Sequence, residues 1–165
     1  MSGIRSRNPS RAPELALTVQ YGTQSGKLPS RTQLRKWARA ALRRTARITL
    51  RIIGGREARS LNRRFRGRDY ATNVLSFAYR DRGPLEGDIA ICAPVLAREA
   101  RERGVSREAH FAHLTVHGVL HLQGHDHLRR REARRMEQLE IRILAGLGYP
   151  DPYGAGKMKD EGDEG

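Results

Sequence analysis

Histidines are concentrated in one short stretch of the chain. Residues 117–127 read HGVLHLQGHDH and contain four histidines and an aspartate. If the stretch begins as a helix, His117 and His121 lie one turn apart on the same face, which allows two imidazole nitrogens to bind one metal ion. His113 continues the row, but it would lie ~12 Å from His121 along the helix axis. One ion therefore cannot readily bind all three, and a third ligand must come from elsewhere.

A third ligand is available just beyond this helix. Gly124 can end the helix and turn the chain back, and His125 and His127 follow it. The spacing H-x-x-x-H-x-x-G-x-x-H, which is the ligand spacing of metzincin proteases, is met by His127 and not by His125. Three imidazoles predict zinc, and three protein ligands leave a fourth position for water, as in catalytic zinc sites. The alternative is a helix with a polar face that merely happens to be rich in histidine.

The residue after the first histidine indicates which bond would be hydrolysed. Zincin proteases have a glutamate there as general base, whereas this chain has Gly118. The usual machinery for peptide cleavage is therefore missing. A metal ion lowers the pKa of its bound water and stabilises charge on a phosphate oxygen. In a basic protein, such a site points to phosphodiester cleavage.

The charge of the chain is its strongest global signal. Among 165 residues, 32 Lys and Arg against 18 Asp and Glu give a formal net charge of +14. A field of this strength attracts polyanions and releases their counterions on binding, so we predict contact with nucleic acid. A stripe of arginines at four-residue steps is either an RNA track or a solvated face of a helix: Arg31, Arg35, Arg39 and Arg43.

The composition also indicates a compartment. No apolar run approaches the ~20 residues of a membrane helix, and no helix pairs basic residues with a broad apolar face, so we expect no membrane contact. The N-terminus lacks the apolar region of a secretory signal, and Cys92 is the only cysteine. We therefore expect a cytoplasmic protein with a reduced thiol.

Periodicity and composition predict one domain between two tails. Residues 1–12 form a flexible basic tail, residues 13–153 a single domain, and residues 154–165 a flexible acidic tail. Alternating apolar residues predict strands, and caps, prolines and glycines bound the helices between them. The predicted strands are 14–20, 46–53, 73–79 and 87–92, and the predicted helices begin after Ser30, at about residue 56, at Pro94, after Ser106 and at about residue 128.

The order of these elements indicates an α+β fold. We predict a mixed four-stranded sheet packed with about five helices, in which strands 73–79 and 87–92 pair antiparallel. The metal-site helix follows Ser106, in the C-terminal half. Met136, Leu139, Ile143 and Leu147 are expected to face inward from the last helix.

These motifs resemble those of the YbeY family of bacterial ribosomal-RNA maturation endonucleases. HGVLHLQGHDH matches the family motif HGxLHLxGyDH except at His125, where the family usually has tyrosine. LNRRFRGRDYATNVLSF (61–77) resembles LNxxyRgxdxpTxVLSF, EGDIAIC (86–92) resembles the strand GDIxI, and residues 136–153 resemble the family's last helix and exit. The resemblance covers about residues 14–153.

The resemblance implies a zinc-dependent, single-strand-directed endoribonuclease that acts in small-subunit rRNA 3′-end maturation and ribosome quality control. It implies one Zn²⁺ per chain, no small-molecule cofactor, and ribosomal RNA and the small subunit with its proteins as partners. It also marks the site residues: His117, His121 and His127 as zinc ligands, and Arg66 as the active-site arginine.

Three side chains near these positions have two interpretations each. An arginine fork at Arg66 would clamp a phosphate and stabilise developing charge, but Arg66 is also one arginine of a basic helix. We expect His113 to support a ligand or a phosphate rather than to bind the metal. Asp126 either orients a ligand imidazole or caps the last helix.

Two other functions compete with RNA cleavage. One is a zinc-dependent hydrolase of another substrate, such as a peptidase, against which the missing glutamate and the positive charge both count. The other is a ribosome-assembly factor that binds RNA and holds a structural metal, against which an open, water-bearing site counts.

Overall fold

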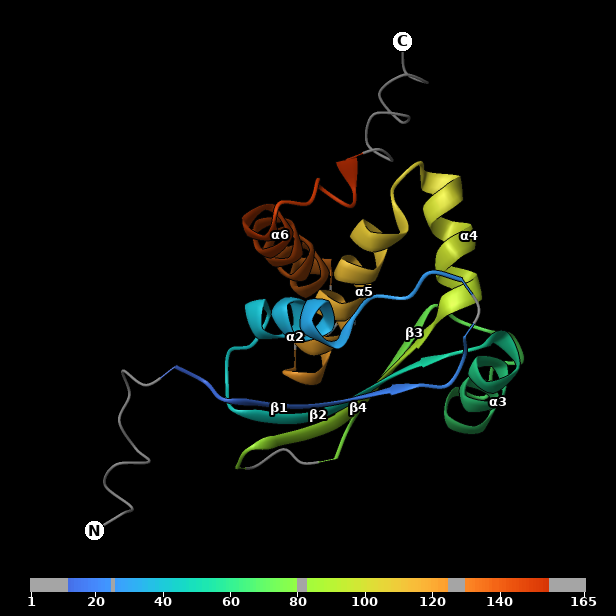
Figure 1. Cartoon of the computed structure of the whole chain (residues 1–165). Helices are drawn as coiled ribbons and strands as arrows, with labels where there is room; N and C mark the ends of the chain where they lie inside the picture. The colour runs from blue at the N-terminus through green and yellow to red at the C-terminus, as the bar shows by residue number, and fades with distance from the viewer. Residues whose placement is uncertain (1–11, 25, 80–82, 125–129, 155–165) are drawn as a thin grey trace.

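One mixed sheet carries most of the helices on a single face (Figure 1). The computed structural model describes residues 12–24, 26–79, 83–124 and 130–154. Its strands stand in the order β1-β2-β4-β3. The first three of these are mutually parallel, and β3 is antiparallel to β4. The predicted α+β class, mixed four-stranded sheet and final antiparallel pair are confirmed. The strands are β1 (Leu15–Tyr21), β2 (Ala46–Ile53), β3 (Val74–Ala78) and β4 (Leu85–Cys92).

Five helices occur within the described ranges, and their order along the chain is the predicted one. The side chains of Ser30 and Ser106 accept hydrogen bonds from backbone N–H groups three residues on, so both predicted N-caps are confirmed. A capped helix start satisfies backbone donors that would otherwise lack partners. The helices are α2 (Arg31–Ala40), α3 (Gly55–Arg66), α4 (Ala93–Arg103), α5 (Arg107–Leu122) and α6 (Arg130–Leu147).

The central helix, α5, lies very close to the sheet. A Cβ atom placed on Gly118 would come within 3.0 Å of Ile89 of β4. A Cβ atom on Gly87 of β4 would meet the Leu122 side chain and the Phe77 carbonyl oxygen, each at 2.7 Å. Glycine at these two positions lets the helix and strand approach, which fixes α5 in place and leaves its histidine-bearing face to meet α6.

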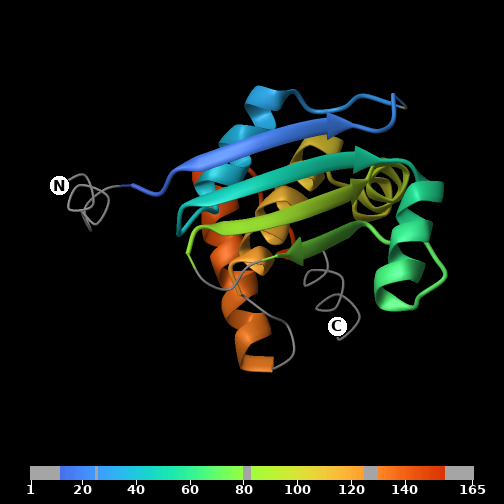
Figure 2. The same ribbon diagram turned by 90° about the horizontal axis from the view of Figure 1, so that it is seen from below.

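The opposite face of the sheet is covered mainly at one end. Alternate residues of a strand point to opposite faces: Ile89 and Ile91 belong to the main core with α2 and α5, whereas Ala90 and Cys92 pack in a smaller cluster with Ala58 of α3. In Figure 2, β3 is the outermost strand, and both α3 and α6 extend past it. The edge strand β3 therefore lies between the two helices.

Close packing at Gly87 gives a stability prediction. Gly87→Ala should destabilise the protein by about 1–3 kcal/mol, because the added methyl group meets a backbone oxygen that cannot move freely. Gly146→Ala is the matched control, since a Cβ there meets nothing within 4 Å and alanine in a helix should stabilise by roughly 0.5–1 kcal/mol. Urea unfolding measures both. Equal midpoints for Gly87→Ala and the unmodified protein would contradict this account of the packing.

Candidate metal centre

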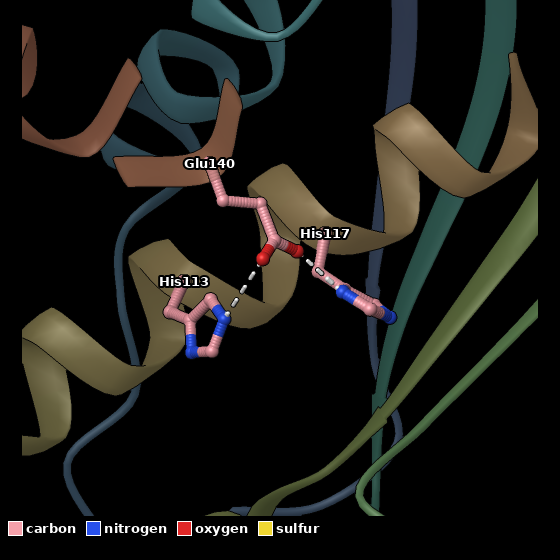
Figure 3. A group of neighbouring side chains, drawn as sticks. All are labelled: His113, His117 and Glu140. Carbon is pink, nitrogen blue, oxygen red and sulfur yellow. Dashed lines mark hydrogen bonds and ion pairs between the residues drawn. The ribbon is translucent and has the colours of Figure 1, made fainter. Parts of the chain in front are cut away.

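A fully buried carboxylate lies at the centre of the histidine cluster (Figure 3). Glu140 of α6 is 0% exposed, and one of its oxygens accepts a hydrogen bond of 2.5 Å from Nδ1 of His117. Its other oxygen accepts a hydrogen bond from the Tyr153 hydroxyl and lies 3.6 Å from Nε2 of His113. The carboxylate thus joins α6 and the segment after it to α5.

The partners of Glu140 keep it ionised. Burial alone would raise the pKa of this carboxyl, but hydrogen bonding and electrostatic attraction from the imidazoles of His113 and His117 outweigh burial and lower the pKa to about 2. Burial of Tyr153, the charge of Glu140 and the hydrogen bond to it all raise the pKa of the Tyr153 hydroxyl, which therefore stays protonated and donates. Burial is also the main cause that lowers the pKa of His113.

The hydrogen bond to Glu140 sets the tautomer of His117. Because the ionised carboxylate can only accept, Nδ1 of His117 carries the proton. A neutral imidazole in this state has its lone pair on Nε2, the nitrogen that can coordinate a metal. Pairing with a carboxylate is the usual way in which proteins orient a metal-binding histidine.

Proximity makes His113, His117 and Glu140 a candidate metal-binding group, because one donor atom from each lies within 4.8 Å of the others. Two donors at 2.0–2.1 Å from one tetrahedral ion would be about 3.3 Å apart. The 2.5 Å between Glu140 and His117 is shorter than that and fits a hydrogen bond. The geometry therefore favours Glu140 as the hydrogen-bond partner of a ligand.

The predicted helical pair is present at the C-terminal end of α5. The rings of His117 and His121 are stacked, with centroids 6.4 Å apart and planes at 20°. The helix ends at Leu122, and Gly124 has φ +94°, the left-handed conformation expected of a helix-ending glycine. The remaining predicted residues of this motif lie outside the described ranges: His125, Asp126 and His127.

His113 has the surroundings of a supporting residue. Its side chain is buried, with 5% exposure, and its Nε2 lies 3.3 Å from the Tyr153 hydroxyl as well as near Glu140. Its supporting role stays a prediction.

Arg66 is in a different environment from the histidines. It is the exposed last residue of α3, the helix that packs on the other face of the sheet. The loop that follows is held by two hydrogen bonds of 2.7 and 3.0 Å from Arg59 to Asp69, and by one from Asn62 to the Tyr70 carbonyl. Hydrogen bonds thus hold the loop that follows Arg66, but Arg66 itself does not belong to the group around Glu140.

Sequence reasoning missed Glu140 and Tyr153. One signal for Glu140 was available, because it is four residues from both Met136 and Leu144 on the buried face of α6. An acid on the apolar face of a helix requires a partner inside the protein. Tyr153 had no comparable signal, since it follows the last helix in a short irregular segment.

The fold and site define a class of protein: an α+β domain whose central helix carries a histidine pair, one member of which is oriented by a buried carboxylate. Residues 20–148 match the family model described as Endoribonuclease YbeY. The chain belongs to the YbeY family of endoribonucleases, which are hydrolases that cleave RNA.

Curated relatives cover nearly the whole chain. Endoribonuclease YbeY of Methylobacillus flagellatus is 52% identical over 147 residues, which make up 89% of this chain and 99% of the relative. Endoribonuclease YbeY of Aromatoleum aromaticum is 56% identical over 142 residues, which cover 84% of this chain and 92% of the relative. The solution structure of TM1509 from Thermotoga maritima is 21% identical and covers 87% of this chain and 93% of its own, with a TM-score of 0.56. That likeness confirms the fold.

The contacts of Glu140 predict its effect on metal binding. Glu140→Gln should weaken the affinity for Zn²⁺ by about 10–100-fold, because an amide holds the His117 tautomer less firmly than a carboxylate. Competition against a chromophoric chelator measures this affinity, and Glu132→Gln, in the first turn of the same helix, is the control. An unchanged affinity would remove Glu140 from the site, and complete loss of zinc would make it a direct ligand.

Proposed function

We propose that this protein is a zinc-dependent, single-strand-directed endoribonuclease that acts in small-subunit rRNA 3′-end maturation and ribosome quality control. The observation that carries the proposal is His117, whose tautomer is set by the buried carboxylate of Glu140 one helical turn from His121. Membership of the YbeY family and the net charge of +14 support RNA as the substrate.

The proposed ligands are His117, His121 and His127. Bound zinc would supply a water of lowered pKa and stabilise charge on a phosphate oxygen. Within the chain, Glu140 holds the proton on Nδ1 of His117 and keeps the ring oriented. We propose one ion per chain, with His113 supporting Glu140 and Asp126 supporting a ligand imidazole.

Arg66 is proposed to bind the phosphate at the cleavage position. Its guanidinium can make paired hydrogen bonds to phosphate oxygens and stabilise the charge that develops there. Gly67, with φ +68°, ends α3 directly after it, and the Arg59–Asp69 pair holds the loop beyond. Because α3 extends past the β3 edge (Figure 2), Arg66 can meet RNA from a different side than the histidines do.

Peptide cleavage fits the site poorly. A zincin general base would require glutamate in place of Gly118, and even a Cβ atom there comes within 3.0 Å of Ile89. The space that a glutamate side chain would need is occupied by the sheet. This packing supports RNA over protein as the substrate.

Ribosomal RNA, the small ribosomal subunit and its proteins are the proposed partners. In the described part of the chain, no helix combines the length and apolar character that crossing a bilayer demands. We propose that the protein acts in the cytoplasm, where ribosomal RNA is processed.

The ligand set can be tested by metal content. His117→Ala, His121→Ala and His127→Ala should each bind well below one zinc ion per chain, because two remaining imidazoles hold the ion weakly. His125→Ala and His113→Ala should keep close to one ion. Elemental analysis of the five purified variants decides the ligands. If His127→Ala kept its zinc and His125→Ala lost it, His125 would be the third ligand in place of His127. Loss of zinc in His113→Ala would favour His113, His117 and Glu140 as the metal-binding group.

Cleavage and binding should separate at Arg66. The zinc-loaded protein should cleave a single-stranded rRNA fragment but not casein, and a chelator should stop the reaction. Arg66→Ala should keep its zinc and bind RNA, yet cleave ~10²–10³-fold more slowly, because a contact that strengthens in the transition state affects rate. Arg66→Lys should rescue only partly, since an ammonium lacks the planar fork.

Single-turnover kinetics, RNA affinity and zinc content are measured together on each variant. Arg56→Ala, in the first turn of the same helix, is the matched control and should cleave normally. Equal rates for Arg66→Ala and the unmodified protein would remove Arg66 from the chemistry. Cleavage of casein in place of RNA would overturn the proposed function.

A further inference from the structure

Large apolar side chains are exposed beside the edge strand. Phe65, Tyr70 and Tyr79 are 57%, 51% and 63% exposed, and all three lie at the end of α3 or just before or after β3. Exposed aromatic residues gathered in one region of a soluble domain mark an interaction site. Two of them are associated with the half-buried Phe77: Phe65 contacts its ring, and Tyr79 follows it by two residues along the chain.

This group follows β3 on the sheet face opposite the main helix layer. The rings of Phe65 and Phe77 are in contact, with centroids 4.9 Å apart and planes at 55°. Phe77 is the register partner of Asp88 on β4, and the Tyr79 hydroxyl donates a hydrogen bond to Asp88. Phe77 and Tyr79 therefore point to the same face. We call Phe65, Phe77 and Tyr79 the aromatic strip.

Positive charge adjoins one end of the aromatic strip. Four exposed arginines surround Phe65 in the sequence at the end of α3: Arg63, Arg64, Arg66 and Arg68. The nearby acid Asp69 is already paired with Arg59, which lowers the pKa of that carboxyl through hydrogen bonding and charge. At the other end, Asp88 is the acceptor of the Tyr79 hydroxyl. The exposed rings suit the base of a nucleotide, and the arginines suit its phosphate.

We propose that the aromatic strip stacks unpaired bases of single-stranded RNA while Arg63, Arg64 and Arg68 at the end of α3 bind the intervening phosphates. The proposal rests on the proposed function, because it specifies how the same substrate is held. Every base has a π-face, so such stacking accepts many sequences. Residues two apart on a strand are about 6.6 Å apart, roughly twice the 3.4 Å rise of a stacked base, which gives Phe77 and Tyr79 room for separate bases.

Duplex RNA does not fit this surface. Its bases stack on one another and offer no free faces. The strip and the histidines also lie on opposite faces of the sheet, with β3 at the edge between them (Figure 2). One RNA molecule that touches both must bend around that edge, which a single strand does far more readily than a helix. The strip therefore provides a physical basis for a preference for single strands.

Base-dependent binding tests the proposal. The zinc-loaded protein is titrated with a short single-stranded RNA, with the same RNA carrying abasic positions, and with a duplex, and gels verify that the RNA stays intact. Phe65→Leu and Tyr79→Leu keep apolar volume but remove the π-face. Each should weaken binding of the normal strand about 5- to 100-fold, the range for loss of one stacked base, and should change abasic binding little. Phe65→Tyr and Tyr79→Phe should restore most of the affinity.

Fluorescence provides a direct second readout. The only tryptophan of the chain, Trp37, is buried at 1% exposure, so Phe65→Trp introduces an exposed reporter. Stacking should quench its emission with the normal strand and not with the abasic one. Three results would each overturn the proposal and leave the strip as a protein-contact surface. They are unchanged RNA affinity in both leucine variants, an equal loss of affinity for the normal and the abasic strand, and absence of quenching.

The same data distinguish this proposal from the proposed function. Base-dependent binding by a protein that cleaves no RNA would overturn the endonuclease while sustaining the aromatic strip. Normal cleavage with leucine variants that bind like the unmodified protein would overturn the strip alone.

Discussion

The hydrogen bonds of one buried carboxylate hold the candidate metal centre together. A charge in a protein interior is costly unless partners surround it, and Glu140 has His117, His113 and Tyr153 around it. These partners come from α5 and from the segment after α6, so the carboxylate can be accommodated only when α5, α6 and that segment are packed together. The packing that satisfies the charge also holds the His117 ring in one tautomer. Stability of the fold and readiness of the metal site therefore depend on the same contacts.

Close packing of α5 on the sheet is the second constraint. Gly118 lies directly after His117, so the face of the helix that neighbours the metal centre is pressed against β4. A glutamate at this position, as in zincins, would collide with Ile89. The fold thus leaves the site without a carboxylate general base there, and a bound metal ion would instead lower the pKa of its own water so that this water loses a proton more readily. Preference for phosphodiester over peptide bonds follows from the packing as much as from the charge.

Much of the fold could be predicted because its signals are local. Alternating apolar residues revealed the strands, capping serines revealed two helix starts, and the short span from 73 to 92 revealed an antiparallel pair. His117 and His121 were found in the same way, since helical spacing alone places them together. Glu140 is 23 residues from His117, and its role appears only when α6 packs on α5. Phe65 and Phe77 likewise meet through the turn of the chain after α3, so their contact was not visible among the arginines that dominate the segment. The role of His127 came from its spacing and from the family resemblance, that of Arg66 from the resemblance, and both remain predictions.

Net charge alone does not determine where RNA can lie. Several arginines are already engaged within the protein: Arg59 pairs with Asp69, Arg44 donates to the Gly83 carbonyl, and Arg31 donates to the Val19 carbonyl and lies over the Tyr21 ring, 5.0 Å from its centroid. Arg31 is the first residue of the predicted arginine stripe, of which Arg43 lies beyond the end of α2, so at least part of that stripe contributes to packing. At the end of α3 the arginines flank exposed rings: Arg68 donates a hydrogen bond to the Tyr70 hydroxyl, and Arg63, Arg64 and Arg66 lie exposed beside Phe65. Charge brings a polyanion towards the whole molecule, whereas stacking holds it only where aromatic faces are bare. On this protein those faces lie along β3, at the edge around which a single strand can reach the histidines.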